Sequence, residues 1–235
     1  MYRVQVAGGG TPCEPPASSS CPETGPSSEG CGRHRLCEAQ PVQSGPWATW
    51  WRKWRWYERN ALPWRRLAIH RELARRGAFA RWPIQGDVLE MLRDGRLDIG
   101  EGTLLEPNVW LTAPAPGRIA IGSGCFLNLG VMVAAVELVE IGDHCMFANG
   151  CFVTDGAHRF DDPEQPVPWQ GFTSKGPTRI GDNVWCGANV VITSGVTIGE
   201  RAVIGANSVV TSDIPAHTIA AGAPAKPIKP IEYGS

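Results

Sequence analysis

His158 is the residue of this chain best suited to move a proton. It closes the segment "VTDGAH", and an irregular stretch rich in acidic residues, proline and glycine follows it. Imidazole exchanges a proton near neutral pH, so it suits a general base that removes the proton of a hydroxyl group. The alternative for a single histidine is a surface or turn position without chemistry. His144, in a turn, and His217, near the C-terminus, are expected to be structural.

The eight cysteines do not predict a metal site or a nucleophile. Four of them have spacings of 8, 10 and 6, which fit no Cys-x-x-Cys zinc clip: Cys13, Cys21, Cys31 and Cys37. The other four lie among small residues and are expected to be buried, reduced thiols: Cys125, Cys145, Cys151 and Cys186. No metal is expected.

The elements that would hold His158 have a period of six residues. Ile-Gly pairs begin at positions 99, 121, 141, 180, 198 and 204. The clearest run is "IGDNVW CGANVV ITSGVT IGERAV IGANSV VTSDIP", in which an aliphatic residue leads nearly every block. Each block predicts a short strand and a tight turn, and three blocks close a triangular coil whose leading aliphatics stack inward. A globular β-sandwich is the alternative, which such regular blocks disfavour.

The largest interruption of the six-residue period comes immediately after His158. Ile141 and Ile180 are 39 residues apart, 21 more than one coil of 18. We therefore expect residues 159–179 to leave the coil as a loop, with His158 as the last residue in register. Long loops in regular scaffolds usually carry function. This loop is predicted to act as a lid and acceptor selector, with Trp169 and Phe172 as its apolar contacts.

The chain before the repeats falls into two parts. Residues 1–45 are rich in Gly, Pro, Ser and Cys, cannot bury enough apolar surface to order, and are expected to be disordered. Residues 46–96 form a Trp/Arg-rich segment, expected to be largely helical, with helices at about 47–60 and 64–77. Within it, residues 46–83 hold seven of the ten tryptophans and a net charge of +8. This segment can pack on the next domain or contact a membrane surface, and it forms no recognisable nucleic-acid module.

The sequence favours a location in the cytoplasm. If the Trp/Arg-rich segment binds lipid, the protein would lie at the inner face of the membrane. No run of 18 apolar residues exists, so no transmembrane helix is predicted. The N-terminus does not have the pattern of a secretory signal. The net charge of −1 neither favours nor excludes nucleic acid as a partner, and none is expected.

Residues 97–229 resemble the hexapeptide-repeat acyltransferases, above all in "IGDNVWCGANVVITSGVTIGERAVIGANSVVTSDIPAHTIAAGAPAKPI". The nearest branches are the galactoside and maltose O-acetyltransferases and the xenobiotic acetyltransferases. The resemblance implies an all-β fold, a left-handed parallel β-helix over residues 97–215, with a C-terminal cap over 216–235. It further implies acetyl-CoA as cosubstrate and a homotrimer with sites between subunits. It assigns the catalytic base to His158.

The resemblance also implies the positions that bind substrates. An acceptor contact falls on Asn128, although Asn128 can instead belong to a ladder of turn asparagines. The loop, interpreted as the acceptor selector, adds Trp169 as a second acceptor contact. Cofactor contacts fall on Ala148, Trp185, Ala188, Ala206, Thr211 and Lys226. Lys226, with Lys229 as a second candidate, stands where the family places a basic residue near the adenosine 3′-phosphate.

Two departures from the family's pattern concern the cofactor. Ala188 replaces a serine of some members, so only a backbone N–H is left for the oxyanion. Ser212 replaces a lysine of many members, which predicts weaker cofactor binding. The partner that orients His158 is open between Asp155, Asp161, a backbone carbonyl and water.

The expected activity is acetyl-CoA-dependent O-acetylation of a saccharide or similar small acceptor, with His158 as general base. The alternatives are O-acetylation of a xenobiotic or antibiotic, N-acetylation of an amino sugar, and a non-catalytic β-helix scaffold. A zinc hydratase on the same helix would need three ligating histidines and an H-x4-H pair, and the repeats contain no such pair.

Overall fold

A computed structural model describes residues 59–234. Several predictions therefore lie outside the described residues. They are the disordered tail at 1–45 with its four cysteines, and most of the helix at 47–60. The described residues 59–234 belong to one compact unit.

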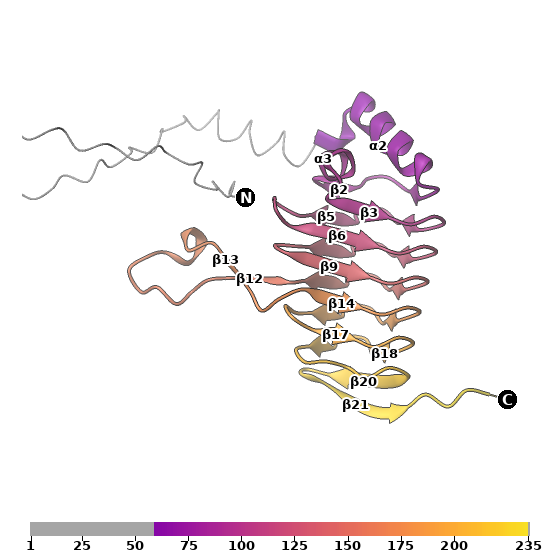
Figure 1. Ribbon diagram of the computed structural model, residues 1–235, viewed down its shortest axis with the longest axis vertical. Helices are drawn as coiled ribbons and strands as arrows, with labels where there is room; N and C mark the ends of the chain where they lie inside the picture. The colour runs from indigo at the N-terminus through magenta and orange to yellow at the C-terminus, as the bar shows by residue number, and fades with distance from the viewer. Residues whose placement is uncertain (1–58, 235) are drawn as a thin grey trace, which may run out of the picture. The chain divides into compact units, whose positions relative to one another are not determined.

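Three sheets of short, mostly parallel strands run along the molecule (Figure 1). Sheet A contains β1 (Phe79–Ala80), β4 (Leu104–Leu105), β7 (Phe126–Leu127), β10 (Met146–Phe147), β15 (Trp185–Cys186), β18 (Val203–Ile204), β20 (Thr218–Gly222) and β21 (Ala225–Pro230). Sheet B contains β2 (Gln85–Gly86), β5 (Trp110–Thr112), β8 (Met132–Ala134), β11 (Phe152–Thr154), β16 (Val191–Ile192) and β19 (Val209–Val210). Sheet C contains β3 (Leu97–Ile99), β6 (Arg118–Ile121), β9 (Leu138–Ile141), β14 (Thr178–Ile180) and β17 (Thr197–Ile198).

Each coil of the chain contributes one strand to each sheet in the order A, B, C. Leu105, Leu127 and Phe147 are in register on successive coils of sheet A. Val133 and Val153 are paired in the same way in sheet B. The result is the predicted left-handed parallel β-helix, a solenoid of about six turns.

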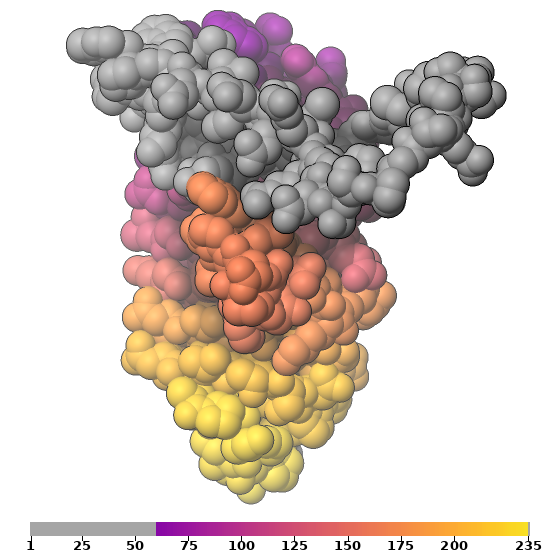
Figure 2. Space-filling model, turned by 90° about the vertical axis from the view of Figure 1, so that its left-hand side faces the viewer, coloured from indigo at the N-terminus to yellow at the C-terminus, as the bar shows by residue number. Residues whose placement is uncertain are grey.

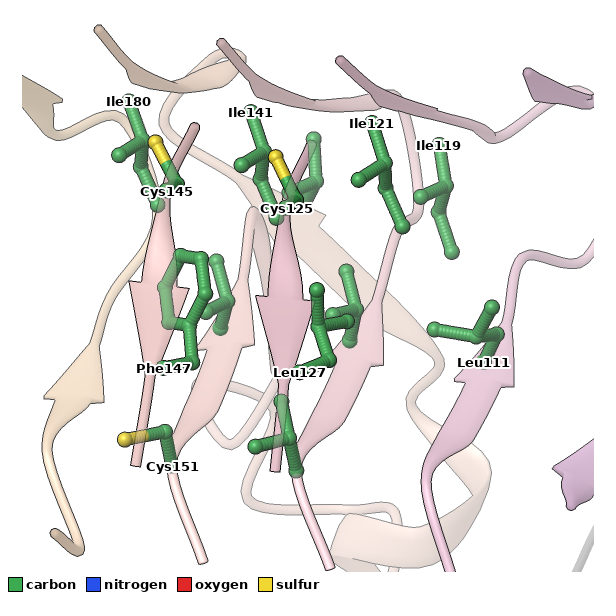
Figure 3. Close-up of a cluster of buried hydrophobic side chains, with 14 of the residues drawn as sticks. Leu111, Ile119, Ile121, Cys125, Leu127, Ile141, Cys145, Phe147, Cys151 and Ile180 are labelled. Carbon is green, nitrogen blue, oxygen red and sulfur yellow. The ribbon is translucent and has the colours of Figure 1, made fainter. Parts of the chain in front are cut away.

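The core is the column of inward side chains that the six-residue period predicts. Figure 3 shows Ile121, Ile141 and Ile180 stacked along one edge of this column, with Phe147 deeper inside. Burying such side chains stabilises the fold by about 1.5–3 kcal/mol each. The prediction of four buried, reduced thiols is confirmed. All four are buried and none forms a disulfide bond: Cys125, Cys145, Cys151 and Cys186.

The corners between the strands require residues that accept a positive φ. Asn189 has a φ of 57° and Gly150, one coil earlier, has a φ of 71°. A Cβ added at Gly150 would lie 2.5 Å from Asn189 Oδ1, so the close approach of neighbouring coils also requires glycine there.

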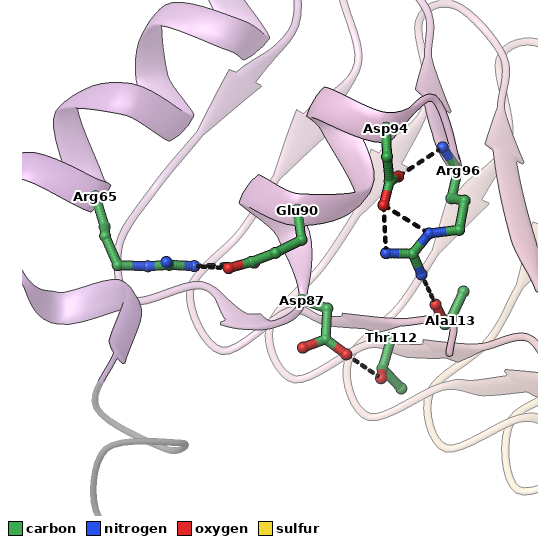
Figure 4. A network of polar contacts seen from close by, with 7 residues as sticks. All are labelled: Arg65, Asp87, Glu90, Asp94, Arg96, Thr112 and Ala113. Carbon is green, nitrogen blue, oxygen red and sulfur yellow. Dashed lines mark hydrogen bonds and ion pairs between the residues drawn. The ribbon is translucent and has the colours of Figure 1, made fainter. Parts of the chain in front are cut away.

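Two helices close the N-terminal end of the solenoid (Figure 1). After the short 3-10 turn η1 (Arg59–Ala61), α2 (Pro63–Arg75) begins with proline in its first turn. A second helix, α3 (Val88–Asp94), ends at Gly95, whose φ is 76°. Polar contacts join these helices to one another and to the first coils (Figure 4). Among them, Nη2 of Arg65 donates to both carboxylate oxygens of Glu90, at 2.7 and 2.9 Å.

The solenoid begins earlier than the sequence analysis placed it. Phe79 already pairs with Leu104, and Gln85 with Trp110, so residues 79–96 form the first coil rather than a part of the N-terminal segment. The six-residue period misses this coil because α3 interrupts it. At the other end, β20 still pairs with β18 inside the predicted cap, and β21 folds back on β20 in antiparallel pairing.

Candidate active site

His158 lies outside the solenoid, on the stem of a hairpin. It ends β12 (Gly156–His158), which pairs antiparallel with β13 (Phe172–Ser174) and places His158 opposite Phe172. The two rings pack with their centroids 4.5 Å apart, and both side chains are exposed. The hairpin stands out from the surface of the solenoid (Figures 1 and 2). The imidazole is therefore presented to solvent on a rigid two-stranded stem.

The hairpin differs in its bounds from the predicted loop. Gly156 already pairs with Ser174, so the chain leaves the coil before His158, which is not the last residue in register. Thr178 already pairs with Val139, so the chain is back in sheet C before residue 179. A six-residue count cannot detect this, because "VTDGAH" suits a strand that stays in the coil and a strand that turns away equally well.

Asp155 fastens the root of the hairpin to the neighbouring coils. Its buried carboxylate accepts hydrogen bonds from the backbone N–H groups of Val136, Glu137 and Leu138, at 2.6, 2.7 and 2.5 Å. Its own carbonyl oxygen accepts a hydrogen bond from the hydroxyl of Ser194, on the following coil. Asp155 therefore links three successive coils at the point where the hairpin starts.

Neither acidic candidate for orienting His158 contacts its ring. Asp155 is occupied by the backbone, and Asp161 forms an ion pair with Arg159, with 3.1 Å between Oδ1 and Nε. The hydrogen bond from Arg159 lowers the pKa of Asp161, which stays ionised. Within residues 59–234, the structure gives the imidazole of His158 the packing contact with Phe172 and no hydrogen bond.

Gln170 holds the tip of the hairpin together, a role that the sequence analysis missed. Its side chain accepts a hydrogen bond from the N–H of Asp162 at 3.0 Å and donates to the carbonyls of Asp162 and Gln165 at 2.8 and 2.7 Å. The short turn η2 (Val167–Trp169) precedes it and leaves Trp169 67% exposed. A single glutamine in an irregular segment gives no periodic signal by which this role could be recognised.

Four predicted site residues gather at the corner between sheets A and B. Asn128 precedes Ala148 by one coil and donates its N–H to the carbonyl of Phe147 at 3.0 Å. On later coils Ala188 and Ala206 occupy the same corner, and Ala188 accepts a hydrogen bond from the N–H of Asn207 at 2.8 Å. Three of the four residues at this corner are alanines, so backbone groups and small side chains line it.

The other predicted site residues lie elsewhere. Trp185 points outward from β15, Lys226 lies exposed on β21, and Thr211 occupies the corner between sheets B and C. His158 leaves the solenoid at that second corner, so the strands of sheet B separate it from Ala148. The two corners are separated by about five residues of extended chain, which span about 16 Å. A single chain therefore does not bring His158 and the Ala148 corner together.

The outer surfaces of the three sheets differ in character. Sheet A carries a continuous outward column of apolar side chains in register: Phe79, Leu104, Phe126, Met146, Trp185, Val203 and Ile219. Sheet B carries a second outward column: Trp110, Met132, Phe152, Val191 and Val209. Sheet C is polar, with Glu140 and Arg179 paired at 3.3 Å on its surface. The sheet B column is half-buried and the sheet A column is partly exposed, and contiguous apolar outer surface is typical of interaction faces.

Two of the buried cysteines, Cys151 and Cys186, are unsuited to act as nucleophiles. Burial raises the pKa of Cys151 and, to a greater extent, of Cys186, so both stay protonated and unreactive. Among residues 59–234 no group of three or more His, Cys, Asp or Glu side chains is arranged to hold a metal ion.

A family model and individual sequence relatives both connect this chain with transferases. The model of a family described as bacterial transferase hexapeptide (six repeats) matches residues 177–212. A Mycobacterium tuberculosis protein named a probable acetyltransferase is 44% identical over 113 residues, which is 48% of this chain and 37% of that protein. An Escherichia coli protein, provisionally named a lipopolysaccharide biosynthesis O-acetyl transferase, is 35% identical over 142 residues, or 58% of this chain and 72% of that protein.

A solved structure of similar fold contains the expected ligand. It is a galactoside acetyltransferase in complex with coenzyme A, 34% identical, with a TM-score of 0.52 over 61% of this chain and 70% of that one. Apart from the Escherichia coli protein described above, the chain spans about half the length of the curated relatives it matches.

Proposed function

The chain belongs to the family of bacterial hexapeptide-repeat transferases, and we propose that it transfers an acetyl group from acetyl-CoA to a hydroxyl group of a saccharide or similar small acceptor. The observation that carries this proposal is the position of His158, an exposed imidazole on a stem fastened at its root by Asp155. The coenzyme A complex of the galactoside acetyltransferase and the names of the relatives support the acetyl donor.

The reaction runs in one step of transfer within a complex of enzyme, acetyl-CoA and acceptor. A ring nitrogen of His158 takes the hydroxyl proton while the acceptor oxygen attacks the carbonyl carbon of the thioester. The resulting tetrahedral intermediate breaks its C–S bond and leaves the acetyl ester on the acceptor. The departing coenzyme A thiolate takes the proton from the imidazolium, which returns His158 to its neutral form. No covalent acetyl-enzyme is needed.

The oxyanion of that intermediate requires a hydrogen-bond donor. We assign this role to the backbone N–H of Ala188. No backbone carbonyl of a described residue accepts a hydrogen bond from this N–H, so the group is available to a ligand. Preorganised backbone donors of this kind typically contribute a factor of about 10²–10³ in rate.

Acetyl-CoA would lie along the corner formed by Ala148, Ala188 and Ala206, with Trp185 beside it. Lys226 is exposed near the last coil and supplies a positive charge for a phosphate of the nucleotide end. Asn128 and Trp169 would contact the acceptor, since an exposed indole ring can pack on the apolar face of a sugar.

A complete site needs a second copy of the chain, because one chain holds His158 and the cofactor corner apart. We propose a homotrimer, in which the apolar outer columns of sheets A and B are covered by neighbouring copies. The number three comes from the family resemblance, and the two apolar faces support the existence of an assembly. The hairpin of one copy would then bring His158 to the Ala148 corner of the next.

Two other acceptors fit the same arrangement of base and cofactor. A xenobiotic or antibiotic alcohol would use the same base and cofactor corner, and N-acetylation of an amino sugar would replace the hydroxyl by an amine. The location in the cytoplasm and the contact of residues 46–83 with a membrane surface also stay predictions.

The test is turnover of acetyl-CoA against a panel of sugar, drug-like alcohol and amino-sugar acceptors, with His158→Asn compared with wild type. Loss of the base should lower kcat by about 10²–10⁴-fold and leave coenzyme A binding unchanged. His144→Asn is the matched control, because His144 has a φ of 57° that asparagine tolerates, and it should keep full activity. A loss of less than tenfold at His158 would count against a general base. A flat coenzyme A binding isotherm for wild type would instead indicate a scaffold.

A further inference from the structure

The N-terminal end of the solenoid presents an outward face that the proposed reaction does not use. Helix α2 turns Ile69 and Leu73 inward, where both are buried. On the opposite side of the helix, Trp64 is 59% exposed and Leu67 is 51% exposed, and Arg71 lies exposed one turn further on. Large apolar side chains are here combined with arginine on one exposed helical face.

Charge is distributed unevenly along the described chain. Residues 59–96 contain nine Lys or Arg and four Asp or Glu, a net charge of +5. Residues 97–234 contain seven basic and fourteen acidic residues, a net charge of −7. The basic end and the acidic solenoid therefore form two oppositely charged parts of one compact unit.

The basic end is only partly neutralised by its own acidic residues. Glu72 accepts hydrogen bonds from both Arg75 and Arg76, at 2.8 and 3.1 Å. The hydrogen bond from Arg76, and to a lesser extent the charges of the two arginines, lower the pKa of Glu72. Arg65 is likewise paired with Glu90. Arg71 has no ion pair with any residue that the structure describes, so its guanidinium is free for an external anion.

We propose that this end of the molecule docks on the surface of an anionic lipid bilayer, with the Trp64–Leu67–Arg71 face of α2 in contact with the headgroups. Tryptophan favours the membrane–water interface, and each Arg near an anionic surface contributes about 1 kcal/mol. An acidic solenoid is repelled by the same surface, which orients the chain with α2 toward the lipid. Indole and leucine side chains gain from an apolar layer that a nucleic acid does not offer.

The sequence next to this face has the same composition. Residues 46–58, which directly precede η1, contain five tryptophans and three basic residues: Trp47, Trp50, Trp51, Trp54, Trp56, Arg52, Lys53 and Arg55. Among the described residues, no helix is long and apolar enough to cross a bilayer. The contact proposed is therefore a peripheral one.

Flotation of the full-length protein with vesicles tests the proposal. Vesicles of phosphatidylcholine with 30% phosphatidylglycerol should retain the protein at least about fivefold better than phosphatidylcholine alone, and about 0.5 M salt should remove that difference. Equal retention on both vesicle types, or no retention on either, overturns it. A short DNA duplex that displaces the protein from the vesicles would instead identify the face as a nucleic-acid site.

Variants assign the contact to α2 rather than to the rest of the chain. The double variant Trp64→Ser with Leu67→Ser and the single variant Arg71→Glu should each weaken vesicle binding at least about fivefold. All three side chains are exposed, so the fold should survive, and thermal unfolding checks this. The matched controls are Ile228→Ser and Arg118→Glu, which change exposed residues of the same kinds on the acidic solenoid. Unchanged binding of the α2 variants, or equal loss in the controls, contradicts the proposal.

Discussion

At the scale of single residues, the side chain of Asp155 combines two tasks that are usually separate. It satisfies three backbone N–H groups at one corner of the solenoid, and it fixes the residue immediately before β12, the strand that carries His158. A Cβ at the next residue, Gly156, would lie 2.4 Å from a methyl carbon of Val136. Both residues therefore determine where the chain can leave the coil, and neither contacts the imidazole directly.

We expect Asp155→Asn to loosen the hairpin. The amide keeps one acceptor oxygen and presents an NH2 group to backbone donors, so buried N–H groups lose their partners at a cost of about 1–3 kcal/mol. The free energy of unfolding should fall by this amount, and limited proteolysis should cut within residues 156–174 sooner. Asp161→Asn, which alters an exposed carboxylate of the same hairpin, is the control and should unfold like wild type. Equal proteolysis of the two variants would show that Asp155 does not fasten the hairpin.

At the scale of elements, the contact between α2 and the first coil contains a titratable group. The indole N–H of Trp82 donates a hydrogen bond to Nε2 of His70 on α2, which requires a neutral imidazole. Burial and, to a lesser extent, the positive charge of Arg66 lower the pKa of His70 below its usual value. The folded chain thus binds this proton less readily than the unfolded chain, whose histidine titrates near about 6.5.

Stability should therefore be complete above about pH 6.5 and should fall as the pH drops from there toward the lower pKa of the folded state. The midpoint of thermal unfolding measured at pH 7.5 and pH 5.5 should show this loss. His70→Gln can still accept the hydrogen bond from Trp82 but cannot titrate, so its midpoint should change less between the two values. His144→Asn should retain the pH dependence of wild type. If all three chains respond alike, other groups control the acid sensitivity.

The sequence predicts some of the strands and loops of this fold and misses others. The period of six residues predicts the coils because every third block returns to the same sheet, as the register of Val153 with Val133 confirms. It does not predict the first coil, since α3 adds residues between β2 and β3. It also misplaces the hairpin by about three residues, because antiparallel pairing such as that of His158 with Phe172 is a contact between distant residues. The position of Gln170 depends on hydrogen bonds to the tip and has no local signal.

At the scale of the whole molecule, the described chain has two parts of opposite charge. The N-terminal end is basic and the sheets below it belong to an acidic domain, which fits a chain oriented at a surface. The first coil and the coil that carries the hairpin are three coils apart, or about 14 Å at 4.8 Å per coil. If α2 rests on a membrane and His158 is the base, the acceptor would be reached close to the headgroups. Under these two proposals, we expect a saccharide attached to a lipid to be accepted better than a free one.

The apolar columns on sheets A and B predict that the isolated chain is not the working form. Met146 lies in the middle of the sheet A column, between Phe126 and Trp185. Met146→Glu would place a charge inside a dry interface, where an unpaired carboxylate costs several kcal/mol. We expect light scattering after gel filtration to give a trimer of 25.4 kDa chains for wild type and a single chain for this variant.

Activity should disappear together with the assembly, since the separated chains hold His158 and the Ala148 corner on different edges of sheet B. Thr197→Glu supplies the control, because it adds the same charge to the polar sheet C, next to Arg179, which can pair with it. That variant should stay trimeric and active. A wild-type chain that turned over acetyl-CoA as a monomer would contradict the shared site. In that case the hairpin would have to close on its own solenoid, across the apolar face of sheet B, to bring the base to the thioester.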